Sequence, residues 1–281
     1  CGLGVMEAAE AIVRIADGRM AGAIRLVSIE RGHDPAKFVA VPFGGGGALH
    51  AGALIKDVGL QAALVPRYPG VTSALGCVIA DIRHDQVQTV NLTVDALDVE
   101  ALDRRMVSEA EAARQVVEEA GLQIDRIDLV FELDMHYLGQ THTVSVPLPV
   151  TVEGGTTGIS REIVQAAFDR AYQASFSRLL PGLQAKIVNL RTSAIGRRPH
   201  FSLKALAPEE GATVGQARRG SRPVWFDGGW HDTAIYARLE LPVGAVIEGP
   251  AILEQPDATT LVDPDLKARV DDFGNVIVER R

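Results

Sequence analysis

Residues 39–54 read VAVPFGGGGALHAGAL, and this stretch predicts a strand, a glycine loop and a helix in direct succession. Val39–Phe43 is a short apolar run with β-branched residues, the pattern of a buried strand. After the glycines, a helix of small and apolar residues is predicted from Ala48 to about Val58. A second apolar run at Ala62–Val65 completes a strand–helix–strand unit, whose two strands are expected to pair in parallel.

The glycine loop itself predicts contact with an anion. Glycine lacks a Cβ, so a ligand can approach its backbone closely, and the N–H groups at a helix N-terminus favour phosphate. Gly44, Gly45, Gly46 and Gly47 are therefore candidate nucleotide contacts, with His50 one turn further on. No Lys-Ser or Lys-Thr follows, so this is not a Walker loop, and no GxGxxG fingerprint is completed. A tight turn that binds nothing is the alternative.

The overall composition is that of a soluble globular protein. Of the 281 residues, 47% are apolar and 23% are charged. The formal charge of −8 and the lack of a basic cluster argue against a nucleic-acid partner. No apolar run reaches the roughly 18 residues of a membrane span, and no signal peptide is predicted. Cys1 and Cys77 form no disulfide framework, which favours the cytoplasm, and Cys77 is expected to be a buried thiol.

Three regions are predicted along the chain: residues 1–95, 96–200 and 201–281. The first is α/β, and its opening helix is expected to break near Gly18. The second is α+β, with a long amphipathic helix and a hairpin. In the third, short apolar runs punctuated by Pro, Gly and Asp predict a mainly β module, with Asp227-Gly228-Gly229 as a hairpin turn. Because the chain starts at Cys1 rather than methionine, it is interpreted as a fragment of a longer protein.

A compact polar cluster follows the helix predicted at 71–80. It contains Asp81, Arg83, His84 and Asp85 within one short segment. Carboxylates and a histidine at this spacing could bind a metal, orient a base or clamp a phosphate, and Asp81 and His84 are the candidate metal ligands. The alternative is a strand entry held by ion pairs.

A second cluster lies in residues 133–144, LDMHYLGQTHTV, which predict a hairpin turning at Gly139-Gln140. On a strand, Asp134 and His136 share one face because side chains alternate with a period of two. These two residues are the candidate catalytic groups. A hydrogen-bonded sheet histidine is the alternative for His136. A third stretch, QPDATT at 255–260, is interpreted as a structural turn rather than a site.

Five stretches taken together resemble the C-terminal part of the hydantoinase/oxoprolinase A-type family. That family includes N-methylhydantoinase A subunits, ATP-dependent 5-oxoprolinases, and subunits of acetone and acetophenone carboxylases. The resemblance covers essentially the whole chain. The stretches are FGGGGALHAGAL at 43–54, VPRYPGVTSALGCVIADIRHD at 65–85, LDMHYLGQTHTV at 133–144, RPVWFDGGWHDTAIYAR at 222–238 and IEGPAILEQPDATTLVDP at 247–264.

The resemblance implies a particular fold. The A-type subunit has an actin-like, sugar-kinase-like nucleotide fold, in which ATP lies between two α/β lobes. The first lobe carries a GxDxGGTxTD motif that this chain lacks. The chain would then be the end of the second lobe, with Gly44–Gly47 facing the nucleotide, followed by an α+β region and a mainly β region. The family loop often reads FGGAG, whereas here it is FGGGG, which keeps the backbone permissive.

The resemblance also implies a function. Family members use ATP, with Mg²⁺, to phosphorylate an amide or enolate oxygen, and a B-type partner subunit usually completes the reaction. The expected parent is the A subunit of an oligomeric, cytoplasmic ATP-dependent hydrolase of cyclic amides such as hydantoin or 5-oxoproline. The isolated chain is expected to be inactive. The alternatives are an A-type subunit of a ketone carboxylase and a non-catalytic fragment that docks a B-type partner.

Overall fold

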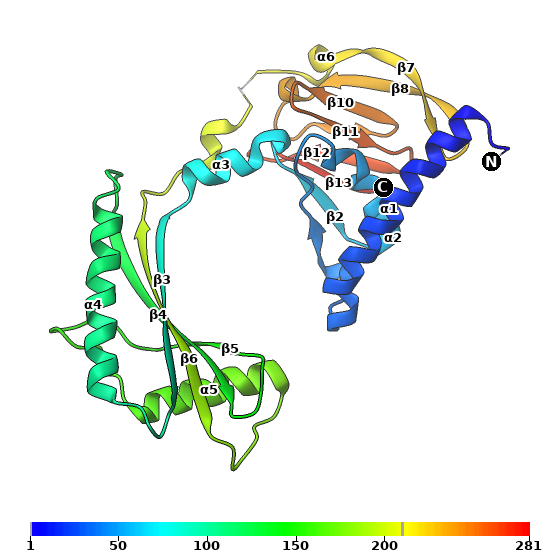
Figure 1. The fold of residues 1–281 in the computed structure, drawn as a ribbon. Helices are drawn as coiled ribbons and strands as arrows, with labels where there is room; N and C mark the ends of the chain where they lie inside the picture. The colour runs from blue at the N-terminus through cyan, green and yellow to red at the C-terminus, as the bar shows by residue number, and fades with distance from the viewer. Residues whose placement is uncertain (1, 209–210) are drawn as a thin grey trace. The chain divides into compact units, whose positions relative to one another are not determined.

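The computed structural model describes residues 2–208 and 211–281, which form two compact units (Figure 1). The first unit combines the residues up to Val78 with Ser202–Arg281, and the second is Ile79–Phe201. Mixed α/β structure with several sheets is therefore confirmed. The division differs from the predicted regions 1–95, 96–200 and 201–281 because a strand from the end of the chain pairs with one from its beginning.

That pairing occurs in the five-stranded sheet of the first unit, in the order β1-β2-β13-β12-β9. The strands are β1 (Val39–Ala40), β2 (Ala62–Val65), β9 (Val246–Glu248), β12 (Leu266–Val270) and β13 (Val276–Arg280). β1 and β2 are parallel, as predicted, and β13 pairs antiparallel with β2. β1 is shorter than the predicted 39–43. Pro42 follows closely and has no N–H to donate to the ladder.

Two helices support the glycine loop. α1 (Val5–Val27) runs unbroken through Gly18, so the predicted break was wrong: the apolar spacing continues past the glycine. After the loop, a single 3₁₀ turn, η3 (Gly47–His50), leads into α2 (Ala51–Val58), which ends at Gly59 in the left-handed region. α1 packs on α2 through a small apolar cluster that contains Ala21, Leu54 and Val58. The start of α2 is buried as well, at Ala51 and Gly52.

A second sheet of the first unit has the order β11-β10-β8-β7. Its strands are β7 (Arg218–Phe226), β8 (Gly229–Ala237), β10 (Ala251–Gln255) and β11 (Ala258–Val262). β7 and β8 form a hairpin around Asp227 and Gly228, both with positive φ, which confirms the predicted turn. The short helices are η1 (Ile29–Arg31), η2 (Pro35–Lys37), η4 (Pro69–Val71), η5 (Leu203–Leu206), α6 (Val214–Ala217) and η6 (Arg238–Glu240).

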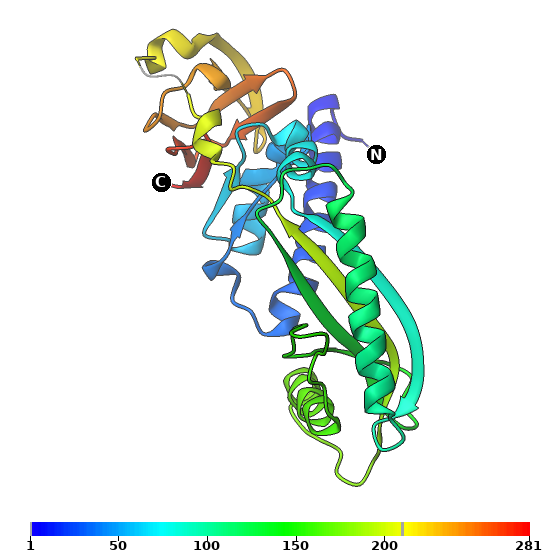
Figure 2. The same ribbon diagram turned by 90° about the vertical axis from the view of Figure 1, so that its left-hand side faces the viewer.

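The second unit is a four-stranded antiparallel sheet covered by two helices (Figure 2). The strand order is β3-β6-β4-β5, with β3 (Ile82–Thr93), β4 (Arg126–Tyr137), β5 (Val144–Pro147) and β6 (Ala185–Arg197). α4 (Val99–Glu118) contacts β3 and β6, and α5 (Arg161–Phe176) contacts β5. Asp98 and Ser160 cap the two helices through their side chains.

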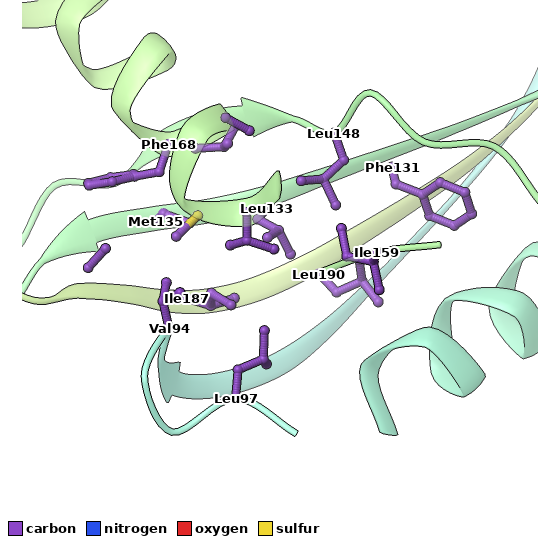
Figure 3. Packing of buried hydrophobic residues seen from close by; sticks show 14 of the residues in the cluster. Val94, Leu97, Phe131, Leu133, Met135, Leu148, Ile159, Phe168, Ile187 and Leu190 are labelled. Carbon is purple, nitrogen blue, oxygen red and sulfur yellow. The ribbon is translucent and has the colours of Figure 1, made fainter. Parts of the chain in front are cut away.

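The apolar core of the second unit lies against one face of β4 (Figure 3). Phe131, Leu133 and Met135 point into the apolar cluster together with residues of β6 and α5. The alternate residues of β4, including Asp134 and His136, lie on the opposite face by the period of two. The strand therefore presents its candidate catalytic residues away from the helices.

α3 (Thr72–Ile79) contains no buried residue. Cys77 on it is exposed, so the expectation of a buried thiol was wrong. The small, apolar composition predicted burial, but no element among the described residues covers this helix enough to bury any of its side chains. In the described part of the chain, no helix combines the length and apolarity that a membrane span requires.

Candidate functional site

In the glycine loop, the N–H group of the first residue is hydrogen-bonded, and the N–H groups of the next two are exposed. Gly44 has φ +82°, which favours glycine, and its N–H donates to the carbonyl of Pro69 at 2.6 Å. The N–H of Gly47 bonds back to the carbonyl of Gly44 at 3.4 Å. Among the described residues, the N–H groups of Gly45 and Gly46 have no hydrogen-bond acceptor, and both glycines are exposed. Two backbone donors are thus free for a ligand.

A second loop and the start of β11 close around the glycine loop. The N–H of Gly70 donates to Asp257 Oδ2 at 2.9 Å. A Cβ on Gly70 would lie 2.5 Å from the Asp257 carbonyl oxygen, and one on Gly45 would lie 3.3 Å from the same atom. Glycine at position 70 is therefore required by the close approach of Asp257. We call residues 44–47, 69–70 and 257 the glycine corner.

The chemistry of the glycine corner follows from these contacts. Two free N–H groups beside the start of a helix attract an anion. The Asp257 carboxylate accepts hydrogen bonds from Gly70 and from the side chain of Gln255. Its negative charge weakens the attraction for a bare phosphate and suits a ligand that also offers hydroxyl donors, such as a nucleoside phosphate.

Sequence reasoning did not place Asp257 in this site. It interpreted residues 255–260 as a structural turn. The only signal was indirect: glycines in two separate loops, at 44–47 and at Gly70, are what a close backbone approach requires. A contact between residues almost 200 positions apart leaves no local pattern, so the partner could not be named beforehand.

His50 is held by α1. Its Nδ1 lies 2.6 Å from Oδ1 of Asp17, whose residue is only 6% exposed. This hydrogen bond ties η3 to α1 and occupies one ring nitrogen. Contact of His50 with a phosphate stays a prediction, and only its other ring nitrogen, Nε2, is available for it.

The candidate metal ligands Asp81 and His84 do not form a ligand set. Asp81 accepts hydrogen bonds from the backbone N–H of Arg198 at 3.0 Å and from Arg197 Nη1 at 2.7 Å, and these two bonds lower its pKa. His84 lies within β3 and alternates with Arg83 and Asp85, which pair with each other at 2.8 Å. Among residues 2–208 and 211–281, no three such side chains gather around a metal position. The structure thus favours the ion-pair alternative.

Asp134 is the centre of a polar network on the face of the second unit's sheet that points away from the helices. It is 7% exposed, accepts from Arg191 Nε at 2.9 Å and accepts from Asn189 Nδ2 at 2.9 Å. Burial raises the pKa of its carboxyl, but the hydrogen bonds and the charge of Arg191 outweigh burial and lower it. Asp134 is therefore a carboxylate at neutral pH, suited to orient or accept rather than to donate a proton.

His136 and Gln140 are turned to local partners. His136 Nδ1 lies 2.7 Å from the carbonyl of Tyr137, which matches the sheet-histidine alternative. Gln140 donates to the hydroxyl of Tyr172 at 2.8 Å. The shared face of Asp134 and His136 follows from the strand, but no hydrogen bond joins them among the described contacts. A joint catalytic role stays a prediction.

Arg191→Met is expected to raise the pKa of Asp134, because burial would then act without the opposing charge. The lowered pKa stabilises the folded chain above the unfolded value of about 3.9, and this contribution is lost as pH falls through the lower folded pKa. Since Arg191 is nearly half exposed, we expect a loss of only about 1 kcal/mol at neutral pH.

The measurement is a carboxyl NMR titration of Asp134 with denaturation at pH 7 and pH 3. Arg126→Met is the matched control, since its ion pair with Asp128 is more exposed and should leave stability within about 0.5 kcal/mol. An unchanged Asp134 titration in Arg191→Met would contradict the assignment.

The first unit also contains a cavity of about 680 Å³ lined by α1, α2, the β7–β8 hairpin and β11. Lys56 Nζ pairs with Asp263 Oδ2 at 2.7 Å on its wall. Burial raises the pKa of Asp263 even though the contacts with Lys56 lower it. Trp225 donates to Glu10 at 2.8 Å on another wall. The glycine corner is not part of this lining.

The fold and the glycine corner define a mixed α/β protein of two units, with an open glycine loop at a strand-to-helix junction. Residues 1–86 match the hydantoinase/oxoprolinase family and residues 98–277 match the hydantoinase/oxoprolinase C-terminal domain. The chain belongs to this family.

Three relatives illustrate its range. The caprolactamase subunit alpha of Pseudomonas jessenii is 31% identical over 96% of this chain, and 5-oxoprolinase 1 of Arabidopsis thaliana is 27% identical over 99%. The acetone carboxylase beta subunit of Xanthobacter autotrophicus is 27% identical over 94%. The chain spans 39%, 21% and 38% of their respective lengths.

A solved structure supports the fold over nearly the whole chain. The crystal structure of the ATP-dependent caprolactamase from Pseudomonas jessenii superimposes with a TM-score of 0.70 at 28% identity. The similarity covers 99% of this chain and 40% of that one. Both units of the present chain therefore have counterparts in one larger protein.

Proposed function

We propose that the chain is the C-terminal part of the A subunit of an ATP-dependent enzyme that opens cyclic amides of the hydantoin or 5-oxoproline type. The observation that carries the proposal is the pair of free N–H groups at Gly45 and Gly46. The relatives support the reaction class: one is a 5-oxoprolinase, and another is a caprolactamase whose structure is described as ATP-dependent.

In this proposal, Gly45 and Gly46 donate their N–H groups to ATP, and the start of the η3–α2 segment adds its dipole. When bound, ATP would supply the phosphoryl group that, on the amide oxygen, makes the ring carbonyl carbon electrophilic enough for attack by water. Among the described residues, no three carboxylate, histidine or cysteine side chains gather, so Mg²⁺ in the complete protein would be held mainly by the phosphates of ATP. The chain's own role is to bind and orient the nucleotide.

The first unit would form one wall of a two-lobed, actin-like cleft. The relatives are more than twice as long as this chain, and the remainder of the subunit would supply the opposite wall. The isolated chain is then expected to show no ring opening. We propose Asp134 and His136 as the acid–base pair of the complete enzyme. Full activity of the complete enzyme with His136→Ala would remove His136 from that role.

Gly46→Val is expected to weaken nucleotide binding about tenfold or more by blocking the approach to the free N–H groups. A Cβ at Gly46 meets no atom within 4 Å, and its φ of −99° is ordinary, so the fold should not change. Calorimetric titration of ATP into the complete subunit measures the affinity, with thermal denaturation alongside. Gly18→Ala on α1 is the control, because it also fills open space. Unchanged affinity in Gly46→Val would remove the loop from the site.

A ketone carboxylase is the second candidate, favoured by the similarity to the acetone carboxylase beta subunit. Relatives of both classes are named as subunits, and we propose a B-type partner subunit in a cytoplasmic complex. A non-catalytic role in docking that partner is the third alternative. ATP-dependent incorporation of labelled bicarbonate into a ketone, assayed beside ring opening of hydantoin and 5-oxoproline, separates the carboxylase from the hydrolase.

A further inference from the structure

A buried arginine lies behind the glycine corner. Arg238 begins η6 directly after β8, and its residue is 3% exposed. β8 runs parallel to β10, with Ala237 opposite Glu254, so Arg238 and Gln255 leave the sheet side by side. Gln255 leads into Asp257, which belongs to the glycine corner. The position of Arg238 thus connects the second sheet with that corner.

The guanidinium of Arg238 binds the chain that leaves β2. Its Nη2 donates to the carbonyls of Val65 at 2.9 Å and Pro66 at 2.5 Å, and its Nη1 donates to that of Arg67 at 2.7 Å. The same Nη1 donates to the side-chain oxygen of Gln255. Three successive carbonyls therefore converge on one side chain, which fixes the course of the chain beyond β2.

From this arginine, hydrogen bonds lead to the glycine corner along two routes. In one, the chain held at residues 65–67 continues to Pro69, whose carbonyl accepts the N–H of Gly44. In the other, Gln255 Nε2 donates to Asp257, which accepts the N–H of Gly70. Both routes end at the N–H groups that define the geometry of the loop.

The chemistry of this position favours arginine over lysine. A planar guanidinium offers five donors in a rigid fork and stays charged when buried. Burial first, and then the nearby charge of Arg67, lower the pKa of Arg238 to about 10, which leaves it protonated at neutral pH. Among the described ion pairs, none includes Arg238, so carbonyl dipoles carry most of its stabilisation.

We propose that Arg238 is a positioning residue: it holds residues 65–67 and Gln255 so that Gly44 and Gly70 stay pinned while Gly45 and Gly46 stay open to the ligand. The assignment of a nucleotide to that opening rests on the proposed function. The positioning itself is a property of the chain and can be measured without a ligand.

The first experiment is amide hydrogen exchange on the full chain with Arg238→Met, which removes the donors and keeps an apolar stem. We expect the N–H groups of Gly44 and Gly70 to exchange about tenfold faster, while the core amides of Ile55 and Val278 change less than about twofold. Arg161→Met is the matched control, because Arg161 likewise binds backbone through its guanidinium, with two bonds to the carbonyl of Leu97, but in the second unit. Equal acceleration at Ile55 and Val278, or none at Gly44, overturns the proposal.

Gln255→Leu is a second variant that leaves Arg238 in place; it removes the bond to Asp257 and a longer bond of 3.3 Å to the carbonyl of Arg67, which Arg238 still holds. It should accelerate exchange at Gly70 more than at Gly44, and its effect should be non-additive with that of Arg238→Met. If Arg238→Met does not fold, Gln255→Leu and Arg238→Lys decide the question. Equal effects of Gln255→Leu on Gly44 and Gly70 contradict the two-route arrangement.

The second experiment uses ATP and the complete subunit. Arg238→Lys, which keeps the charge but not the fork, should raise KM for ATP about tenfold and leave kcat at saturating ATP unchanged. A loss of kcat with unchanged KM overturns the positioning role. If the wild-type subunit binds no ATP, the proposed function fails, whereas the exchange experiment still decides the role of Arg238.

Discussion

Phe131→Ala is expected to lower the free energy of unfolding of the second unit by about 4 kcal/mol, the usual loss for a buried phenylalanine whose cavity does not collapse. Phe131 is 0% exposed and belongs to the cluster that joins β4, β6 and α5 (Figure 3). Its removal leaves a void in a cluster to which both covering helices contribute residues. The effect should be confined to the second unit, because the cluster contains no residue of the first.

Two spectroscopic signals separate the units in this test. Both tryptophans, Trp225 and Trp230, lie in the first unit, so their fluorescence reports on that unit alone, whereas circular dichroism reports on both. In urea, the dichroism transition should move to lower concentration while the fluorescence transition stays. Val116→Ala, on the exposed side of α4, is the control and should cost less than about 1 kcal/mol. A fluorescence shift equal to the dichroism shift would contradict confinement.

Gly52→Ala is expected to destabilise the first unit by about 3 kcal/mol, opposite in sign to the usual gain of about 1 kcal/mol for this change inside a helix. A Cβ at Gly52 would lie 2.5 Å from Asp263 Oδ2. That oxygen is held at 2.7 Å by Lys56, so the carboxylate cannot move without breaking the ion pair. The new methyl group therefore separates α2 from β11.

Gly18→Ala is the matched control for this prediction, since no atom lies within 4 Å of a Cβ at Gly18 in the middle of α1. It should stabilise the chain by about 1 kcal/mol. Tryptophan fluorescence in urea measures both variants. Stabilisation by Gly52→Ala would show that Asp263 is free to move, and the argument from close packing would fail.

Local patterns predicted the elements that depend on local chemistry. The amphipathic spacing predicted the long helix of the second region, which is α4, and the side chain of Asp98 caps its first turn. Asp227 and Gly228 supplied the positive φ angles of a hairpin turn, and the parallel pairing of β1 with β2 followed from the strand–helix–strand order. In each case, the cause lies within a few neighbouring residues.

The rest depended on contacts between distant residues. The pairing of Val65 with Val276 joins the beginning and end of the chain in one sheet, and no periodicity in the sequence predicts it. The glycine loop was identified, but its neighbour Asp257 and the arginine behind it were not, because a close approach and a buried guanidinium leave no local signature. For Cys77, composition suggested burial, whereas burial depends on what covers α3.

The strands that begin and end the second unit are direct neighbours, with Ile82 opposite Gly196. The chain therefore enters and leaves this unit at one place, while β2 and β13 pair directly in the first unit and its two sheets contain no strand from the second. Such an arrangement makes residues 79–201 an insertion. We therefore expect that lengthening, replacing or exchanging these residues leaves the strand register that holds the glycine loop unchanged.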